Sequence, residues 1–207
     1  MTSLGSRLST AEGTLSKKLD ATAITDYYTK TETDTKATTI AAGEISKYDA
    51  SLVIGGINLI TNSAFKDGTK AWQGDSQAVL SIVDDTKGFF GKAIKVVTSR
   101  NNGLRAVGAN RYNQTAGEYY TFSGWVRADV TTTVNVYIGT GVAKQLSVGT
   151  TWQYFTYTQK SLGGTSYDPK LFTTVGTFYA TNLKAERGTK ATDWSISTDD
   201  TQNALNA

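Results

Sequence analysis

The stretch "EYYTFSGWVRADV" (residues 118–130) decides the fold because its side chains alternate between two kinds. On an extended strand, Phe122 and Val126 share one face, and Trp125 and Arg127 share the other. A period of two in apolar side chains is typical of a β-strand that packs one face on a core. The aliphatic face is expected to point inward, which leaves Trp125 and Arg127 outside.

The next run, "TTTVNVYIG" (residues 131–139), repeats this alternation. Val134 and Val136 share the inward face, and Asn135 and Tyr137 share the opposite one. Other β-branched and aromatic runs are "VLSIVDD" (79–85), "KAIKVVTS" (92–99), "GLRAVGA" (103–109), "TWQYFTYTQ" (151–159) and "TFYATNLKA" (177–185). About eight short strands with turn residues between them, and no helical pattern among them, predict an antiparallel jelly-roll β-sandwich.

The first fifty or so residues follow a helical period instead. The apolar positions of a first helix have the 4-3-4 spacing of a coiled-coil seam: Leu4, Leu8, Ala11 and Leu15, with Leu19 one turn further on. A second helix is expected from about Lys30 to Leu52, preceded by a capping box of Thr29 and Glu32, and its apolar positions are Ala41, Ile45, Tyr48 and Leu52. We expect these stripes to associate between chains as a coiled-coil shaft; the alternative is a helix folded back on the globular domain.

Composition excludes several classes of function. The 207 residues include no cysteine and no histidine, which removes disulfides, Cys/His zinc sites, thiol nucleophiles and Ser-His pairs. A net charge of +3 is too mild to indicate a nucleic-acid partner, and "SLVIGGINLI" (residues 51–60) is too short to span a bilayer. Adjacent Asp84 and Asp85 would point to opposite faces of a strand or into water, so we expect no catalysis. No cofactor is predicted either.

Four motifs, in order, resemble a known family. "YYTKTETD" (residues 27–34) resembles a segment common in the helical shafts of phage tail fibres and tail-tip host-specificity proteins. "GGINLITNSAF" (55–65) followed by Trp72, "YTFSGWVRA" (120–128) and "LKAERGTKATDW" (183–194) resemble the first strand, the central strand and the closing turn of carbohydrate-binding-module-like jelly rolls on bacteriophage tail proteins. The resemblance implies a homotrimeric fibre end that carries a sugar-binding domain.

The chain departs from this family at two positions. Ala185 stands where a larger aliphatic residue is usual, and Lys66 stands where many members have a carboxylate that helps to bind structural calcium. No metal is therefore predicted, and Asp67, Asp84, Asp85 and Asp193 are interpreted as solvated turn residues. The tryptophans at element ends, Trp72, Trp152 and Trp194, are interpreted as structural.

Two groups of outward residues are candidates for glycan binding. The first is Trp125, Arg127, Asn135 and Tyr137, which would lie side by side if their strands pair. An aromatic ring offers its face to the C–H side of a sugar, and amide or guanidinium groups bind hydroxyls and carboxylates. The second group lies in and near "SRNNGLRAVGANRYN" (residues 99–113): Arg100, Arg105, Arg111 and Tyr112, with Arg127 close by in sequence. Arginine suits planar anions such as a sugar carboxylate. The alternatives are a Trp125 covered by a loop or by the second sheet, and arginines that are ordinary surface charge.

These observations lead to one hypothesis and one alternative. Residues 1–52 are expected to be a helical shaft or trimerisation segment, 53–196 a jelly-roll domain and 197–207 a polar tail. The hypothesis is a non-enzymatic receptor-binding tip on the virion tail, which recognises a bacterial surface polysaccharide and contacts other phage tail proteins. The alternative is a structural spacer or assembly cap of the fibre with no ligand of its own.

Overall fold

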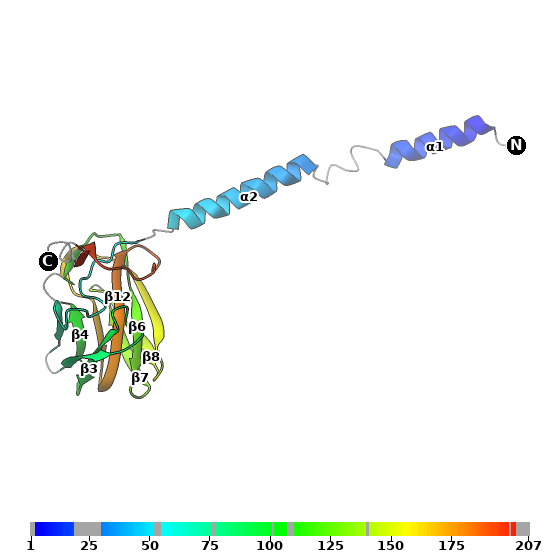
Figure 1. Ribbon diagram of the computed structural model, residues 1–207. Helices are drawn as coiled ribbons and strands as arrows, with labels where there is room; N and C mark the ends of the chain where they lie inside the picture. Colours follow the sequence, from blue (N-terminus) through cyan, green and yellow to red (C-terminus); the bar gives the residue numbers. More distant parts are fainter. Residues whose placement is uncertain are drawn as a thin grey trace. The chain divides into compact units, whose positions relative to one another are not determined.

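The computed structural model describes residues 3–18, 30–51, 55–75, 78–100, 102–106, 110–139, 141–198 and 200–201 (Figure 1). These residues belong to two compact units, Met1–Ala50 and Ser51–Ala207. Each unit is described by itself below.

The first unit contains two helices, α1 (Leu4–Lys18) and α2 (Lys30–Ser51), the second of which continues one residue into the next unit. Both were expected from the helical spacing. On α1, Leu4, Leu8 and Leu15 are exposed, so this chain alone does not bury the apolar stripe. The coiled coil stays a prediction, and the Thr29 cap, Leu19, Leu52 and the side chains of Ile45 and Tyr48 lie outside the described residues.

The second unit is built from strands. In chain order these are β1 (Trp72–Gly74), β2 (Val79–Asp84), β3 (Lys92–Thr98), β4 (Asn102–Ala106), β5 (Tyr112–Gln114), β6 (Tyr119–Ala128), β7 (Thr132–Tyr137), β8 (Lys144–Val148), β9 (Gln153–Lys160), β10 (Gly164–Tyr167), β11 (Lys170–Thr173) and β12 (Gly176–Arg187). All of their pairings are antiparallel.

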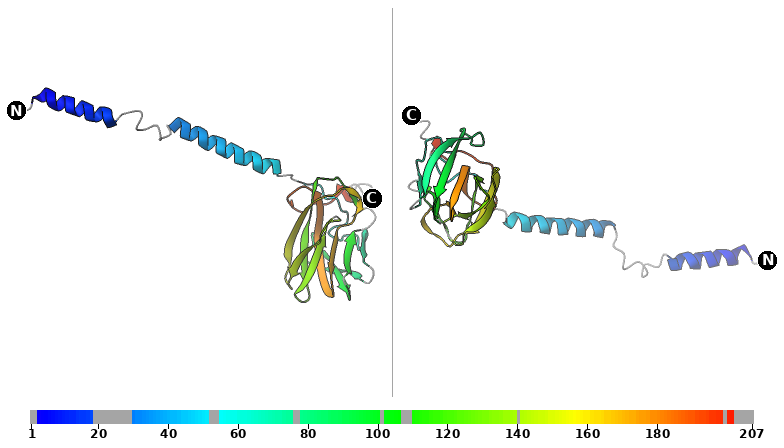
Figure 2. Two further views of the ribbon diagram at one scale, coloured as in Figure 1. Left: turned by 180° about the vertical axis from the view of Figure 1, so that it is seen from behind. Right: turned by 90° about the horizontal axis from the view of Figure 1, so that it is seen from below.

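Two five-stranded sheets form the layers of a β-sandwich (Figure 2). We call the sheet with strand order β2-β3-β12-β6-β9 sheet I, and the sheet with order β1-β4-β11-β7-β8 sheet II. Strands β5 and β10 form a separate ribbon. Because the chain passes repeatedly from one sheet to the other, the arrangement is that of a jelly roll, and the mainly β prediction is confirmed.

The core lies between the two sheets and uses the residues that alternation placed inward. Phe122 and Val126 of β6 meet Val134 and Val136 of β7 there, and all four are fully buried. At a transfer free energy of about 25 cal/mol per Å² of apolar area, this burial is the main favourable contribution to folding. The outward residues of the same strands do not contribute to this core and can therefore take part in a binding site.

The N-terminal motif is not a strand. Residues 55–65, which resemble a first strand, are irregular in the structure, because asparagine side chains satisfy the backbone groups that a strand would pair. Asn58 Oδ1 accepts from the Ile60 and Ala185 amides, while Asn58 Nδ2 lies within hydrogen-bond distance of Leu183 O and Ser195 O. Asn58 thus joins the start of the domain to its end.

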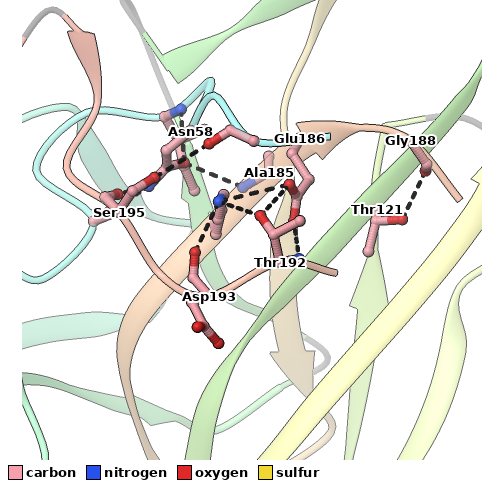
Figure 3. A network of polar contacts seen from close by, with 12 residues as sticks. Asn58, Thr121, Ala185, Glu186, Gly188, Thr192, Asp193 and Ser195 are labelled. Atoms are coloured by element: carbon pink, nitrogen blue, oxygen red, sulfur yellow. Dashed lines mark hydrogen bonds and ion pairs between the residues drawn. The ribbon is translucent and has the colours of Figure 1, made fainter. Parts of the chain in front are cut away.

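The closing motif folds over part of the outer face of sheet I. Lys184 and Glu186 of β12 point outward yet are buried, because the segment after β12 folds over them (Figure 3). Lys184 Nζ donates to Thr192 Oγ1 at 2.6 Å and to Asp193 O at 2.8 Å. Thr192 Oγ1 in turn donates to Glu186 Oε2 at 2.7 Å, and the Thr192 amide donates to Glu186 Oε1. The motif is therefore a lid over a buried ion pair.

The end of this segment is also tied to the sandwich. Trp194 Nε1 donates to Ser63 Oγ at 3.1 Å, and the Asn62 amide donates to Asp200 Oδ2 at 2.7 Å. Asp200 belongs to the stretch expected to be a polar tail, and its carboxylate thus also has a contact with the domain.

Candidate functional site

The four outward residues predicted to lie side by side are divided between the two sheets. Strand β6 pairs with β12 and β9, whereas β7 pairs with β11 and β8. Trp125 and Arg127 therefore lie on the outer face of sheet I, and Asn135 and Tyr137 lie on the outer face of sheet II. The condition for one shared site, that the two strands pair, is not met, so the side-by-side arrangement was wrong.

The outer face of sheet II brings three predicted residues together. Lys170 of β11 is the register partner of Arg105 on β4 and of Tyr137 on β7, so these three side chains form one row. In the next row, Phe172 of β11 is the partner of Asn135. We call Arg105, Asn135, Tyr137, Lys170 and Phe172 the sheet II site.

Two carboxylates balance the positive charges of this site. Asp168 Oδ2 lies 3.5 Å from Arg105 Nε and 3.7 Å from Lys170 Nζ, and Asp75 Oδ1 lies 3.7 Å from Arg105 Nη1. These distances are long for charge-assisted hydrogen bonds, which are about 2.7–2.9 Å. Arg105 Nε is buried and has no hydrogen-bond partner among the described residues. This enclosed N–H is not accessible to a ligand, which would instead contact the exposed quarter of the Arg105 side chain.

Tyr137 adds an aromatic surface to the site. Its hydroxyl donates to Gly139 O at 2.9 Å, and Lys170 Nζ lies 6.0 Å from its ring centroid. Burial, and then the negative charge of Asp168, raise the pKa of Tyr137 above its ordinary value. The side chain is therefore a neutral phenol at physiological pH, with a half-buried ring held in a fixed orientation.

Arg127, on the other sheet, is held by its neighbours. Its guanidinium lies 3.7 Å from the ring centroid of Tyr179, and its Nη2 lies 3.6 Å from Asp85 Oδ2. The guanidinium also lies 5.3 Å from the ring centroid of Trp152, and the Trp152 indole donates to Asp85 Oδ1. These internal contacts hold the guanidinium in place, but the Arg127 side chain is 25% exposed, as is that of Arg105, so its role in glycan binding stays a prediction. The structural interpretation of Trp152 is confirmed.

Trp125 lines a groove of about 470 Å³ on the outer face of sheet I. The groove is lined by Ser123, Trp125, Tyr154, Asn182, Ala191, Thr192, Asp193 and Trp194. Trp125 is half-buried, so it is not fully covered by a loop or by the second sheet. Trp194 has a structural contact, as predicted, but its ring also forms a wall of the groove. Trp72 is buried against Phe65, which confirms its structural interpretation.

The remaining predicted residues do not join either surface. Arg100 follows the end of β3 and Arg111 precedes β5, and both are exposed. Tyr112 stacks on Tyr120 at 5.9 Å and packs against the core, with its hydroxyl oxygen buried. Arg105 and Arg127 lie on different sheets, so the four arginines do not form one anionic-sugar site.

Sequence reasoning did not place Lys170, Phe172, Asp168 or Tyr154 in a binding site. Lys170 and Phe172 lie on β11, a four-residue strand too short for a clear alternation. Tyr154 lies in the quoted run of residues 151–159, and its outward position followed from alternation with the buried Phe155.

The part of the chain that the structure describes holds no group of three or more His, Cys, Asp or Glu side chains arranged to bind a metal ion. Asp84 instead pairs with Lys92, whose hydrogen bond and charge lower the pKa of that carboxyl group. Among the described helices, none is long and apolar enough to cross a membrane.

Comparisons with known proteins support the fold. Neither a protein-family model nor a curated protein matches the sequence. Among solved structures, the chain is similar to the CBM22-1 xylan-binding domain of Paenibacillus barcinonensis Xyn10C, with a TM-score of 0.51 and 12% identity. The match covers 67% of this chain and 99% of that domain. At this identity the likeness shows a shared fold, that of a carbohydrate-binding-module jelly roll.

Two larger proteins are similar over a part of their length. The enzymatically active domain of bacteriophage CBA120 tailspike protein 4 has a TM-score of 0.47 at 14% identity, over 63% of this chain and 21% of that one. The CBM22-1–GH10 modules of Clostridium thermocellum xylanase 10B, complexed with xylohexaose, have a TM-score of 0.49 at 13% identity. This match covers 69% of this chain and 30% of that one.

Proposed function

We propose that residues 53–196 form a non-catalytic glycan-binding domain and that its ligand lies on the sheet II site. The observation that carries this proposal is the row of Arg105, Lys170 and Tyr137 on three adjacent strands, with the side chains of both cations about one-quarter exposed. The shared fold with a xylan-binding domain adds support.

The chemistry of the site suits a polysaccharide. The ring of Tyr137 offers a face to the C–H groups of a sugar, and Phe172 adds apolar surface in the next row. Arg105 and Lys170 donate to hydroxyl or carboxylate oxygens, while Asp168 accepts from hydroxyls. Strands β4, β7 and β11 hold all of these groups except Asp168, which lies between β10 and β11, and this order lowers the entropic cost of binding.

Binding without cleavage is the better proposal for this chain. A glycosidase needs two carboxyl groups that flank one glycosidic bond. The adjacent pair in the sequence does not provide this arrangement, because Asp84 pairs with Lys92 while Asp85 contacts Arg127 and Trp152. Incubation with capsular or cell-wall polysaccharide is expected to release no reducing ends, and reproducible depolymerisation would contradict the proposal.

The biological setting that we propose is the receptor-binding tip of a phage tail fibre, on the virion tail and in contact with other tail proteins. The support is the shaft-like sequence of residues 27–34 and the exposed leucines of α1. Three parallel chains would bury this stripe and place three weak glycan sites on one fibre, which raises avidity without new contacts.

Glycan-array and cell-binding measurements on the intact chain test the proposal. Arg105→Ala and Tyr137→Ala are expected to weaken binding at least tenfold, whereas Arg111→Ala, the matched exposed arginine, is expected to leave it unchanged. If both variants bind the glycan as tightly as the wild type, the sheet II site is not the binding site. Light scattering should give about three times 22.2 kDa for the intact chain, and a monomer would contradict the trimer.

A second candidate function is a structural spacer or assembly cap of the fibre. It is favoured by the cluster around Arg127, where a cation, an indole and a carboxylate that could face a ligand contact one another instead. On this alternative, Tyr137→Ala would leave host attachment intact, while truncation of residues 53–196 would prevent assembly.

A further inference from the structure

We infer that the groove on sheet I is a second carbohydrate-binding site, separate from the sheet II site and suited to a neutral sugar unit. The groove is lined by three aromatic side chains, Trp125, Tyr154 and Trp194, together with hydroxyl, amide and carboxylate groups. Its volume of about 470 Å³ falls within the range of about 300–1,000 Å³ that is usual for small-molecule sites. Apolar faces with a few polar groups are the lining that a sugar ring requires.

One aromatic wall is fixed by contacts outside the groove. The Trp194 indole donates to Ser63 Oγ at 3.1 Å, and its ring lies 4.7 Å from Phe89 and 6.2 Å from Phe90. With its N–H bonded and its edges packed, Trp194 has little rotamer freedom left to lose when a ligand binds. The wall is therefore pre-organised.

The second aromatic wall is also fixed. The ring of Trp125 meets Tyr154 edge-to-face, with 5.4 Å between centroids. Lys87 Nζ lies 3.1 Å from the Trp125 centroid, and Lys87 is not one of the residues that line the groove. This cation therefore covers one face of the indole, and a ligand in the groove would meet the part of Trp125 that lines it.

Asn182 explains why the lysine is in place. It sits at the irregularity of β12 between Thr181 and Lys184, with a φ of 50° that non-glycine residues adopt only rarely. Its Oδ1 accepts from the Phe89 amide at 2.8 Å, and its Nδ2 donates to Lys87 O at 3.0 Å. A strained residue thus ties the loop that carries Lys87 and Phe89 to the edge of the groove, and such strain is often kept at binding sites.

The polar group best placed for a ligand is the carboxylate of Asp193. Its backbone oxygen accepts from Lys184 Nζ, which fixes the residue, while the exposed carboxylate points away from that network and has no hydrogen-bond partner among the described residues (Figure 3). A carboxylate accepts hydrogen bonds from adjacent sugar hydroxyls but repels an acidic sugar. The groove therefore fits a neutral glycan, whereas the sheet II site with its two cations also accepts an acidic one.

Tryptophan provides a selective probe, because all four tryptophans are described and none lies on the outer face of sheet II. Trp125 and Trp194 line the groove, Trp72 is buried in the core, and Trp152 contacts Arg127. In the intact chain labelled with fluorotryptophan, fluorine NMR should give one signal for each, assigned by Trp→Phe variants. Titration with xylohexaose, cellohexaose, galactotriose and trigalacturonate then reports on the groove directly.

A neutral oligosaccharide is expected to move the Trp125 and Trp194 signals and to leave the Trp72 signal in place, also in the Tyr137→Ala variant. Asp193→Ala, at an exposed position that the fold does not need, should weaken this response at least tenfold. Trp125→Ala should abolish the response of Trp194. In the same titrations, the NMR signals of the backbone amides of Tyr137 and Lys170 report on the sheet II site.

The outcomes separate the two proposals. Oligosaccharides that shift the sheet II amides but move neither groove tryptophan overturn the second site and leave the proposed function standing. Movement of the groove tryptophans alone supports the second site and removes the sheet II site. If no probe moves either set of signals, both proposals fail. A response to trigalacturonate that exceeds the response to the neutral sugars would overturn the neutral-ligand assignment.

Discussion

The outer faces of the two sheets carry similar charged residues, which are buried on sheet I and partly exposed on sheet II. On sheet I, Lys184 and Glu186 point outward from β12, yet their side chains are 2% and 0% exposed because the closing segment covers them. On sheet II, Arg105 and Lys170 point outward beside Asp168 and remain about one-quarter exposed. The covered pair is joined through the Thr192 hydroxyl, whereas the open set is held at 3.5–3.7 Å.

This difference teaches which charged residues stabilise the fold and which are available to a ligand. Desolvated charges are tolerated only when every polar atom has a partner, and the closing segment supplies those partners to Lys184 and Glu186. The open face leaves about one-quarter of the Arg105 and Lys170 side chains exposed. We therefore assign stability to the covered face and ligand binding to the open one, and the following predictions test this division.

The largest effect is expected at the covered pair. Glu186→Ala leaves the Lys184 ammonium buried without its carboxylate, and breaking a buried pair in this way costs about 3–5 kcal/mol. The free energy of unfolding from denaturant titration measures this loss. The double substitution Lys184→Met with Glu186→Leu should recover much of it, because no charge is then left buried. A loss below about 1 kcal/mol for Glu186→Ala, the range of exposed pairs, would contradict the assignment of stability to this face.

The next effect is expected at the open face and appears in binding. With an acidic polysaccharide as the ligand, Arg105→Ala should weaken binding tenfold or more, since hydrogen bonds to charged groups contribute about 1.5–3 kcal/mol. Arg105→Lys should restore binding only in part, because an ammonium cannot bind a carboxylate with two parallel hydrogen bonds. Raising the salt concentration should weaken binding as well, since exposed charges are screened over about 8 Å at physiological ionic strength.

A neutral polysaccharide would give a different pattern at the same face. Binding would then depend on Tyr137 and Phe172, and salt would have little effect. Salt-independent binding that survives Arg105→Lys would rule out an acidic ligand at the sheet II site. Attachment measured across a salt series with wild type, Arg105→Lys and Tyr137→Ala distinguishes these cases.

The longer strands and their faces could be predicted from the sequence, but short strands such as β11 and the sheets to which the strands belong could not. Alternation placed Phe122, Val126, Val134 and Val136 in the core correctly. Strands adjacent in the chain pair or lie next to each other about two-thirds of the time, yet β6 and β7, separated by a short connection, belong to opposite sheets. That choice depends on pairing with β11 and β12, which come much later in the chain, and no local pattern encodes it.

The burial of polar side chains could not be predicted from the sequence either. Glu186 lies in a motif whose family resemblance was recognised, but its burial depends on Thr192 folding back over it. The groove beside Trp125 depends on the irregularity of β12 at Asn182, which no period reveals. Such features result from side-chain hydrogen bonds between distant segments.

A smaller effect is expected at an exposed pair, which provides the matched control for the covered one. Arg187 Nη2 lies 2.7 Å from Glu118 Oε1, but the Arg187 side chain is 57% exposed. Glu118→Ala should therefore lower the free energy of unfolding by less than about 1 kcal/mol, measured beside Glu186→Ala in the same denaturant series. If the two substitutions cost the same, burial by the closing segment is not what makes the covered pair important.

The smallest effect at neutral pH is expected at Tyr112, which the sequence suggested as a binding residue and the structure places against the core. Its buried hydroxyl lies beside Gln114 but makes no hydrogen bond of good geometry among the described residues, so Tyr112→Phe should not lower the free energy of unfolding by more than about 0.5 kcal/mol at pH 7 and should leave glycan binding unchanged. Burial raises the pKa of the Tyr112 hydroxyl. The unfolded chain then loses this proton at the ordinary tyrosine pKa of about 10, before the folded chain does. The free energy of unfolding therefore falls as pH rises above about 10, and Tyr112→Phe should make that fall less steep. Equal alkaline slopes for the two proteins, or a loss of glycan binding in the variant, would return Tyr112 to the surface where the sequence pattern suggested it.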